Sequence, residues 1–333
     1  MNNKIVQNEI PNNGVDVSSL GLGGAPLSAF LFDVDENVAV STIKRAFQLG
    51  MRYFDTAPYY GFGRGERRYG RALAEFRRTD FKISTKVGRV LIPADLHATD
   101  DGFVPHELDA VADYSRDGVM RSVDESLKRL HMDHIDIVYV HDPESNLQQA
   151  IDESVPALSE LKAQGIISAV GVAMNQWEML DLFVKECELD CILLAGRYTI
   201  IDYSALSVLL PRCEEMGTAV ILGAPYHNGV LCSDLSQNTY YYTSRESKSM
   251  LLPIDKLELA RNIKVVCQRY AVPLKAVALQ FGLAHPAVIS TIPGSVTSGE
   301  IEDNLKMINH SIPTELWSEL KYENLLPQEA PTP

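Results

Sequence analysis

The chain has 333 residues, of which 46% are apolar and 22% are charged, and its formal net charge is −14. This composition can build a large core, and the negative charge argues against a surface for nucleic acid or anionic membranes, because a polyanion would be repelled. No apolar run approaches membrane-spanning length, and the N-terminal segment MNNKIVQNEIPNNG is polar without a hydrophobic signal region. We therefore expect a soluble, cytoplasmic protein.

The cysteines and histidines suggest neither disulfides nor a metal site. The 5 cysteines are odd in number and contain no Cys-x-x-Cys pair, which favours reduced thiols. No cluster of His, Cys and carboxylate residues has the spacing of metal ligands. We expect no metal.

Short apolar segments alternate with helical patterns along almost the whole chain. Eight strands, each followed by a helix, indicate an α/β fold of the (β/α)8 barrel type. The predicted strands are Leu20–Gly23, Tyr53–Thr56, Lys82–Val87, Ile135–His141, Ala169–Met174, Ile192–Ala195, Ala219–Ala224 and Val288–Pro293. The predicted helices are Val38–Leu49, Arg67–Phe76, Gly118–Leu130, Gln148–Gln164, Gln176–Cys187, Leu206–Met216, Asp255–Tyr270, Lys275–Ala284, Thr297–Ile308 and Glu315–Asn324.

A doubly wound sheet is the alternative architecture. It requires a glycine fingerprint after its first strand, and the glycines between Leu20 and Leu27 miss the G-x-G-x-x-G spacing. We expect a single domain over residues 1–333, with a barrel core near 15–310 and a C-terminal helix and tail at 311–333. Two long connections, Gly88–Tyr114 and Tyr226–Pro253, follow strands and should form functional loops on the catalytic face.

Three ionisable residues end successive predicted strands: Asp55, Lys86 and His141. Tyr60 follows Asp55 within a glycine-containing loop. Each residue alone has a structural explanation, as a turn cap, a snorkelling lysine or a satisfied core histidine. Because parallel strands of a barrel converge at one mouth, and burying such groups is costly, their coincidence predicts an active site.

Successive motifs resemble those of the aldo-keto reductase superfamily, in that family's order, from about residue 15 to residue 310. The motifs are D-T-A-P-Y-Y-G, I-S-T-K-V-G-R, V-Y-V-H-D-P, G-V-A-M-N, G-A-P-Y-H-N-G-V-L and I-P-G-S-V-T-S-G-E-I-E-D-N-L. Within the superfamily the chain most resembles the NAD(P)-linked aldose 1-dehydrogenases, with pyridoxal 4-dehydrogenase and L-galactose dehydrogenase as related enzymes.

The resemblance implies a catalytic tetrad of Asp55, Tyr60, Lys86 and His141. Tyr60 would be the general acid/base, and the Lys86 ammonium would favour its phenolate. Asp55 would hold Lys86, and His141 would orient the substrate oxygen. Tyr59 is a rival for the role of Tyr60.

The resemblance also implies where a nicotinamide cofactor binds. Asn175 would contact the carboxamide, and backbone N–H groups of Ser295 and Val296 would face phosphate. NADP-preferring relatives have a lysine and an arginine where this chain has Gly294 and Glu300, so NAD should be preferred over NADP. The full set of expected cofactor residues is Asn175, Gly223, Ala224, Pro225, Asn228, Gly229, Leu231, Gly294, Ser295, Glu300, Asp303 and Asn304.

The expected substrate is an aldose of the L-fucose, D-arabinose or L-galactose type, oxidised at the anomeric carbon to a lactone. Pyridoxal or another aldehyde or ketone is the alternative substrate, and a non-catalytic interaction subunit is the alternative class. We expect a monomer or small homo-oligomer. Candidate substrate contacts are Ala25, Phe30, Tyr59, Arg89, Asp142, Arg197 and His227.

Overall fold

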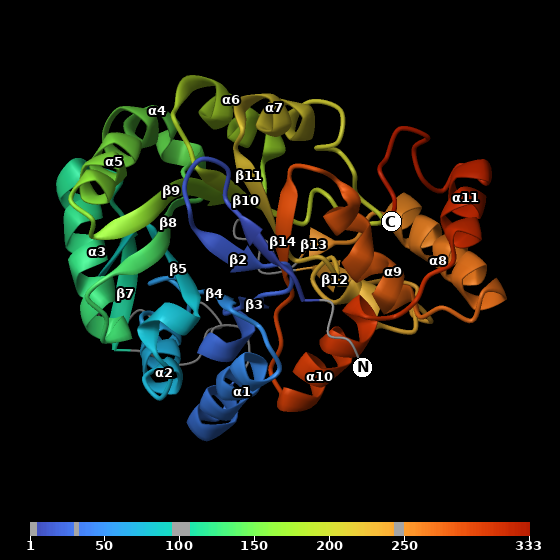
Figure 1. Cartoon of the computed structure of the whole chain (residues 1–333), viewed down its shortest axis with the longest axis horizontal. Helices are drawn as coiled ribbons and strands as arrows, with labels where there is room; N and C mark the ends of the chain where they lie inside the picture. The colour runs from blue at the N-terminus through green and yellow to red at the C-terminus, as the bar shows by residue number, and fades with distance from the viewer. Residues whose placement is uncertain (1–4, 30–32, 95–106, 243–249) are drawn as a thin grey trace.

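The computed structural model describes residues 5–29, 33–94, 107–242 and 250–333. At its centre, parallel strands form one sheet in the order β14-β11-β10-β9-β8-β5-β4-β3. Helices surround this sheet (Figure 1), so the predicted α/β barrel is confirmed. Its strands are β3 (Leu22–Gly23), β4 (Tyr53–Asp55), β5 (Lys82–Val87), β8 (Ile135–His141), β9 (Ile167–Met174), β10 (Cys191–Ala195), β11 (Ala219–Gly223) and β14 (Val288–Ile292).

The first and last strands close the sheet into a barrel. Parallel bridges join Leu20 to Thr291 and Gly23 to Gly294, and the Gly21 N–H donates to the Thr291 carbonyl at 2.9 Å. Closure removes the exposed edges of the sheet and directs the carboxyl ends of all its strands to one mouth. The candidate catalytic residues therefore meet in space although they are far apart in sequence.

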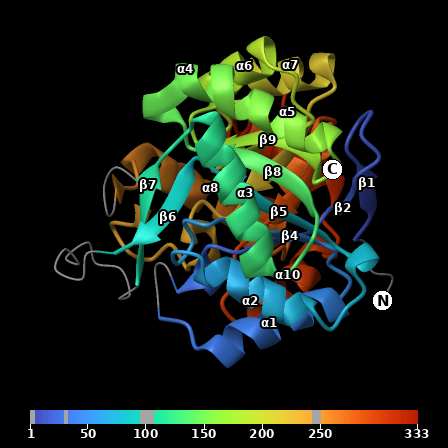
Figure 2. The same cartoon turned by 90° about the vertical axis from the view of Figure 1, so that its left-hand side faces the viewer.

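The helices form the outer layer of the barrel, which Figure 2 shows from the side. Asp35 caps the first helix by accepting the N–H groups of Asn37 and Val38. The second helix begins at Arg64, three residues before its predicted start, and the helix predicted from Leu206 begins at Leu209. The helices are α1 (Glu36–Gln48), α2 (Arg64–Leu73), α3 (Arg116–Leu130), α4 (Leu147–Gln149), α5 (Val155–Ala163), α6 (Trp177–Glu186), α7 (Leu209–Met216), α8 (Ile254–Arg269), α9 (Leu274–Phe281), α10 (Ser298–Ile308) and α11 (Thr314–Tyr322), with a π-helical turn at Ala150–Ser154 between α4 and α5.

A hairpin that the sequence patterns did not predict covers the amino ends of the barrel strands. Its strands β1 (Gln7–Glu9) and β2 (Asp16–Ser18) pair antiparallel, and β2 lies across the middle of the ring in Figure 1. Asn8 Nδ2 donates to the Ile289 carbonyl at 2.7 Å, and Asn13 Nδ2 donates to the Ser168 carbonyl at 3.1 Å. Both acceptors lie at the starts of barrel strands, so the hairpin closes the end opposite to the predicted mouth.

The two long connections, for which the sequence predicted functional loops, each contain a two-stranded ribbon. In the first, β6 (Arg89–Pro93) pairs antiparallel with β7 (Leu108–Ala112). In the second, β12 (Tyr241–Tyr242) pairs with β13 (Met250–Leu251). Both ribbons follow strand ends of the barrel, as expected for connections on the catalytic face.

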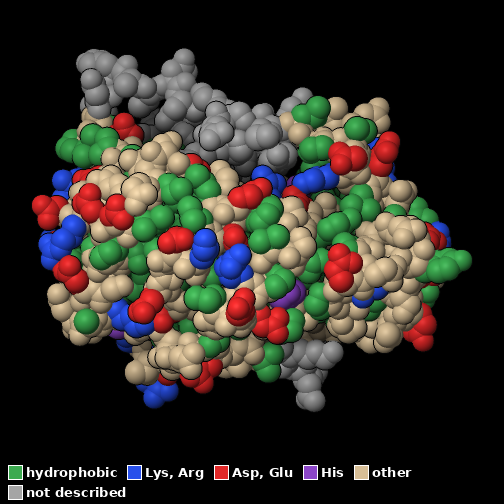
Figure 3. Space-filling model, turned by 90° about the horizontal axis from the view of Figure 1, so that it is seen from above, with side chains coloured by type: hydrophobic (Ala, Val, Ile, Leu, Met, Phe, Trp, Pro, Cys, Tyr) green, Lys and Arg blue, Asp and Glu red, His purple; other side chains and the backbone are tan. Residues whose placement is uncertain are grey.

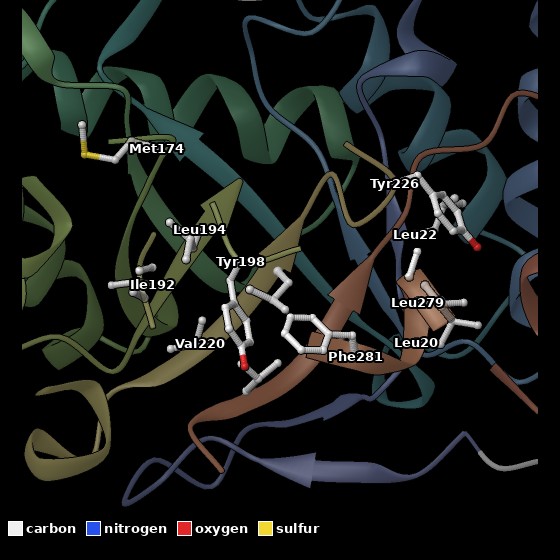
Figure 4. Packing of buried hydrophobic residues seen from close by; sticks show 14 of the residues in the cluster. Leu20, Leu22, Met174, Ile192, Leu194, Tyr198, Val220, Tyr226, Leu279 and Phe281 are labelled. Carbon is white, nitrogen blue, oxygen red and sulfur yellow. The ribbon is translucent and has the colours of Figure 1, made fainter. Parts of the chain in front are cut away.

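Buried apolar side chains form one cluster inside the barrel and a larger one between strands and helices. Figure 4 shows part of the larger cluster, where Tyr198 and Phe281 pack with a centroid distance of 5.1 Å. On the face drawn in Figure 3, acidic and basic side chains are interspersed and form no single basic patch. Within the described residues, no helix combines the length and apolarity needed to cross a membrane.

Candidate active site

Asp55 and Lys86 form a buried ion pair at the carboxyl ends of two neighbouring strands. Because β4 and β5 are paired in parallel, Lys86 Nζ lies 2.8 Å from Asp55 Oδ1 and 2.7 Å from Asp55 Oδ2. It donates a third hydrogen bond, at 2.8 Å, to the Thr56 carbonyl. An ammonium has three N–H donors, so these acceptors use all of them. Any influence of Lys86 on Tyr60 is therefore exerted by its charge through space.

Tyr60 stands beside this pair, in the turn that follows β4. Its ring centroid is 4.8 Å from Lys86 Nζ and 5.7 Å from the ring centroid of His141. Burial raises the pKa of the Tyr60 hydroxyl well above its usual value, and the carboxylates of Asp55 and Asp142 act in the same direction. The expectation that Lys86 favours the phenolate thus meets a larger opposing effect from burial. The rival Tyr59 is farther from His141, at 6.5 Å between ring centroids.

His141 ends β8, the strand next to β5, and its backbone is held by Tyr114. Tyr114 Oη donates to the carbonyl oxygens of His141 and Asp142, each at 2.6 Å. Burial, with the charges of Lys86 and Arg89, lowers the pKa of His141 well below its usual value, so the imidazole is neutral. Nε2 lies 3.5 Å from Asp142 Oδ2, whereas among the described residues the buried Nδ1 has no hydrogen-bond partner. Nε2 is therefore the ring nitrogen that faces a polar group.

Asp142 and Arg89, two of the candidate substrate contacts, lie near His141 in this cluster. Burial and the nearby Glu144 carboxylate raise the pKa of Asp142 to about 7, and the charge of Arg89 opposes that increase. Asp142 has a left-handed backbone with φ of 45°, which is strained for a residue with a side chain. Within the part of the chain that the structure describes, the buried Nε of Arg89 has no hydrogen-bond partner.

Arg197 and His227 belong to a second cluster at the ends of β10 and β11. Arg197 Nη1 lies 3.3 Å from Asp202 Oδ2, and Lys256 Nζ pairs with the same carboxylate oxygen. Burial and the charge of Lys256 lower the pKa of His227 to about 4. Arg197, Asp202 and Lys256 line a cavity of about 550 Å³. Arg197 and His227 thus share their surroundings with Asp202 and Lys256, two residues that the sequence analysis did not consider.

The remaining substrate candidates lie around the first strands. The Ala25 carbonyl accepts a hydrogen bond from Ser28 Oγ at 2.6 Å, and Ala25 precedes the 3-10 turn Pro26–Ser28. Phe30 lies outside the described residues.

The loop after β11 has the backbone of a binding loop. Ala224, His227 and Asn228 have φ angles of 49°, 49° and 53°, and each left-handed non-glycine residue costs about 1–2 kcal/mol. Asn304 secures the loop: its Oδ1 accepts from Tyr226 Oη at 2.7 Å, and its Nδ2 donates to Ser295 Oγ at 3.1 Å. Asn304 therefore connects the loops that follow β11 and β14. Its amide, expected to contact the cofactor, already takes part in this connection.

The first turn of α10 uses two of the expected cofactor groups for its own capping. Thr297 Oγ1 accepts the Glu300 N–H at 3.3 Å, and Glu300 Oε2 accepts the Val296 N–H at 2.7 Å, in the manner of a capping box. The Val296 N–H expected to face phosphate is thus already paired. Asp303 forms an ion pair with Lys275 of α9, a cation that the sequence analysis did not consider.

The last residues of β10 and β11 have small side chains, which leave the space that a flat cofactor ring needs. Nothing lies within 4 Å of the position of a Cβ on Gly196. Asn175 Nδ2 donates to the Ala195 carbonyl at 2.7 Å, which places this predicted carboxamide contact at the edge of that open space. With the strained loop after β11 and the amino end of α10, these residues fit a dinucleotide.

The sequence analysis missed Tyr53, Ser84 and Tyr139, which lie beneath the site. Each precedes a predicted catalytic residue by two positions: Tyr53 before Asp55, Ser84 before Lys86, and Tyr139 before His141. Because strand side chains alternate between faces, a residue two positions earlier faces the same side, one layer deeper in the barrel. This spacing is the signal that could have identified them. Tyr114 has no comparable signal, because its role depends on the β6–β7 ribbon.

Comparisons with known proteins identify the family of this chain and support its fold. A model of the Aldo/keto reductase family matches residues 19–322. D-threo-aldose 1-dehydrogenase of a Pseudomonas species is 32% identical, with 94% of this chain and 96% of the relative covered. Pyridoxal 4-dehydrogenase of Microbacterium luteolum is 33% identical, with the same coverage of 94% and 96%. The holo structure of an aldo-keto reductase from Bacillus halodurans has a TM-score of 0.78 at 23% identity, covering 99% of this chain and 98% of that one, which supports the fold.

Proposed function

Since the chain belongs to the aldo/keto reductase family, whose members are oxidoreductases that use nicotinamide cofactors, we propose that it oxidises an aldose at the anomeric carbon with NAD. The observation that carries this proposal is the cluster of Asp55, Lys86, Tyr60 and His141 at one mouth of the barrel. A cyclic aldose would lose hydride from its anomeric carbon and a proton from its hydroxyl, and would leave as a lactone.

Each residue of the tetrad has a role that its surroundings support. NAD, when bound, supplies the hydride acceptor. The neutral imidazole of His141 donates a hydrogen bond from Nε2 to the substrate oxygen, and Tyr60 takes the proton of the anomeric hydroxyl as general base. Lys86 is held by Asp55 and Thr56, so its positive charge stays beside the phenol and stabilises the phenolate. The anomeric hydroxyl is more acidic than an ordinary alcohol, which eases this transfer.

A preference for NAD is supported by the charges at the start of α10. Glu300 carries a negative charge in the first turn, where a 2′-phosphate of roughly −1.5 to −2 charge would be repelled. The nearby Lys275 is paired with Asp303, which reduces its availability to a phosphate. Glu300 would instead accept a hydrogen bond from a ribose 2′-hydroxyl, an exchange for its present bond to the Val296 N–H.

An aldose substrate is supported by the polar groups beside His141. Asp142 and Arg89 offer an acceptor and a charged donor for sugar hydroxyls, and a relative that is 32% identical is a D-threo-aldose 1-dehydrogenase. A site that hydrogen-bonds several hydroxyls should reject sugars with one hydroxyl inverted, because its buried polar groups would be left unpaired. The similarly related pyridoxal 4-dehydrogenase makes pyridoxal the alternative substrate.

Steady-state kinetics over a substrate panel test the proposal. With NAD as cofactor, we expect turnover of L-fucose, D-arabinose and L-galactose, which share their configuration near the anomeric carbon, and poor turnover of D-glucose. The same panel with NADP tests the cofactor preference, and pyridoxal is included as the competing substrate. Efficient oxidation of pyridoxal with no turnover of these sugars would contradict the aldose assignment and favour the alternative.

A further inference from the structure

A continuous chain of buried hydrogen bonds lies beneath the ion pair of Asp55 and Lys86. Ser84 Oγ is 2.7 Å from Asp55 Oδ1, and Tyr53 Oη is 3.0 Å from Ser84 Oγ. Tyr139 Oη is 3.0 Å from Tyr53 Oη, and Cys191 Sγ is 3.7 Å from Tyr139 Oη. Ser84, Tyr53, Tyr139 and Cys191 are all 0% exposed. We call this set the barrel chain.

The barrel interior provides the space that these two large phenols need. A Cβ on Gly171 would lie 2.6 Å from Tyr139 Cδ1, and a Cβ on Gly21 would lie 3.1 Å from Tyr53 Cδ1. Any larger residue at Gly171 would therefore displace the Tyr139 ring. Hydroxyls in an apolar interior are expensive to bury unless they are hydrogen-bonded, and the barrel chain satisfies both phenols without water.

One end of the barrel chain is the carboxylate of Asp55, which only accepts hydrogen bonds. This acceptor fixes the direction of every other hydrogen bond in the barrel chain. Asp55 accepts a hydrogen bond from Lys86. Its charged carboxylate also attracts the Ser84 proton more strongly than the neutral Phe54 carbonyl, which lies 3.5 Å from Ser84 Oγ. Ser84 has only one O–H, so it must accept from Tyr53, and Tyr53 must in turn accept from Tyr139. Burial raises the pKa values of both tyrosines well above the usual one, so both keep the proton that they donate. All donors therefore point toward Asp55.

We propose that the barrel chain sets the position and effective charge of Asp55, and thereby the acid–base behaviour of Tyr60, with Ser84, Tyr53 and Tyr139 as positioning residues. This inference rests on the function proposed above. Aligned hydrogen bonds polarise one another, so the positive ends of their dipoles accumulate at the carboxylate. Ser84 thus offsets part of the Asp55 charge, which is one of the causes that raise the pKa of Tyr60. Without that donor, the Asp55 charge acts on Tyr60 more strongly.

Removal of the Ser84 hydroxyl is the direct test, with the pH dependence of kcat/KM for oxidation as the readout. In Ser84→Ala, the rising limb of the profile should move to higher pH by about half a unit or more, and kcat should fall roughly tenfold, since a hydrogen bond to a charged group is lost. Tyr53→Phe should shift the limb in the same direction by a smaller amount, because it weakens the donor without removing it. If Ser84→Ala does not fold, the pH profile of Tyr53→Phe decides the question.

The matched control is Ser290→Ala. Ser290 is also 0% exposed and donates to a backbone carbonyl, that of Ser18, at 2.7 Å, outside the barrel chain. It should lose comparable stability in thermal unfolding while its pH profile stays that of the wild type. A folded Ser84→Ala or Tyr53→Phe enzyme with an unshifted profile would overturn the proposal. Failure of the proposed function is a separate outcome, because it is seen with other measurements: the wild-type enzyme turns over none of the proposed sugars with NAD, or Tyr60→Phe retains normal turnover.

Discussion

At the scale of single residues, Lys86 and Tyr60 are close together but act on each other without a direct hydrogen bond from the lysine. All three donors of Lys86 are used by Asp55 and the Thr56 carbonyl. Burial and the Asp55 carboxylate raise the pKa of Tyr60 well above its usual value, so the phenol stays protonated at neutral pH. The neutral His141 lies next to Tyr60, with a distance of 5.7 Å between their ring centroids, and Tyr60 is our proposed proton-transfer group.

Tyr60→Phe tests that role. We expect kcat to fall by roughly 10²–10⁴-fold, the usual contribution of general acid–base catalysis, while the dissociation constant for the cofactor stays unchanged in a fluorescence titration. Because the pKa of Tyr60 is raised, mainly by burial, kcat/KM for oxidation by the wild type should increase with pH beyond neutrality as phenolate forms. Carbonyl reduction, which needs the phenol, should persist to high pH. If Tyr59→Phe rather than Tyr60→Phe abolished turnover, the roles would be exchanged.

At the scale of elements, the first turn of α10 combines helix capping with the proposed cofactor selection. Glu300 accepts the Val296 N–H, and Thr297 accepts the Glu300 N–H. The same helix is joined to the loop after β11 through Asn304 and Tyr226. A substitution at Glu300 should therefore change both cofactor choice and helix stability.

Glu300→Arg should move the ratio of kcat/KM for NADP over NAD upward by about tenfold or more, since one charged hydrogen bond is worth roughly 1.5–3 kcal/mol. The lost cap should lower the free energy of unfolding by about 1 kcal/mol. Adding Gly294→Lys would be a poor test, because a Cβ there would lie 2.6 Å from Pro26 Cγ.

Glu302→Arg is the matched control on the same helix. It reverses the same charge, but Glu302 pairs with Arg45 of α1 at 2.7 Å. For Glu302→Arg, the ratio of kcat/KM for NADP over NAD should stay near that of the wild type. An equal shift in both variants would show that net charge, and not the position of Glu300, governs the choice.

At the scale of the whole molecule, the barrel has one end for chemistry and one end closed by the β1–β2 hairpin. Ile10, at the tip of the hairpin, is 0% exposed and packs in the interior cluster with Tyr53 and Tyr139. The hairpin therefore supports the floor of the barrel chain.

Ile10→Ala should lower the free energy of unfolding by about 2–5 kcal/mol, the usual cost of emptying a buried isoleucine site, measured by urea denaturation. Val6→Ala, in the same segment but 59% exposed, should change it by no more than about 0.5 kcal/mol. Both variants should keep the kcat of the wild type at low temperature. An Ile10→Ala protein as stable as Val6→Ala would contradict a structural role for the hairpin.

The sequence by itself was enough to predict the barrel, the family and the strand-end positions of Asp55, Lys86 and His141. Local periodicity carries this information: short apolar segments between helices indicate parallel strands, and a polar residue at the end of such a segment marks the mouth. The proposed NAD preference likewise rests on residue identities at Gly294 and Glu300. Helix starts were less well predicted, because Arg64 follows a glycine turn whose geometry no pattern specifies.

Only the tertiary structure decided which groups are neighbours across strands and loops. Tyr53, Ser84 and Tyr139 become one hydrogen-bonded chain because β4, β5 and β8 are adjacent and closure sets their relative depth. Packing likewise placed Arg197 with Asp202 and filled the space beside Gly294 with Pro26. These contacts join residues far apart in sequence, and their distances depend on register and closure, which the periodicity of a single segment does not encode.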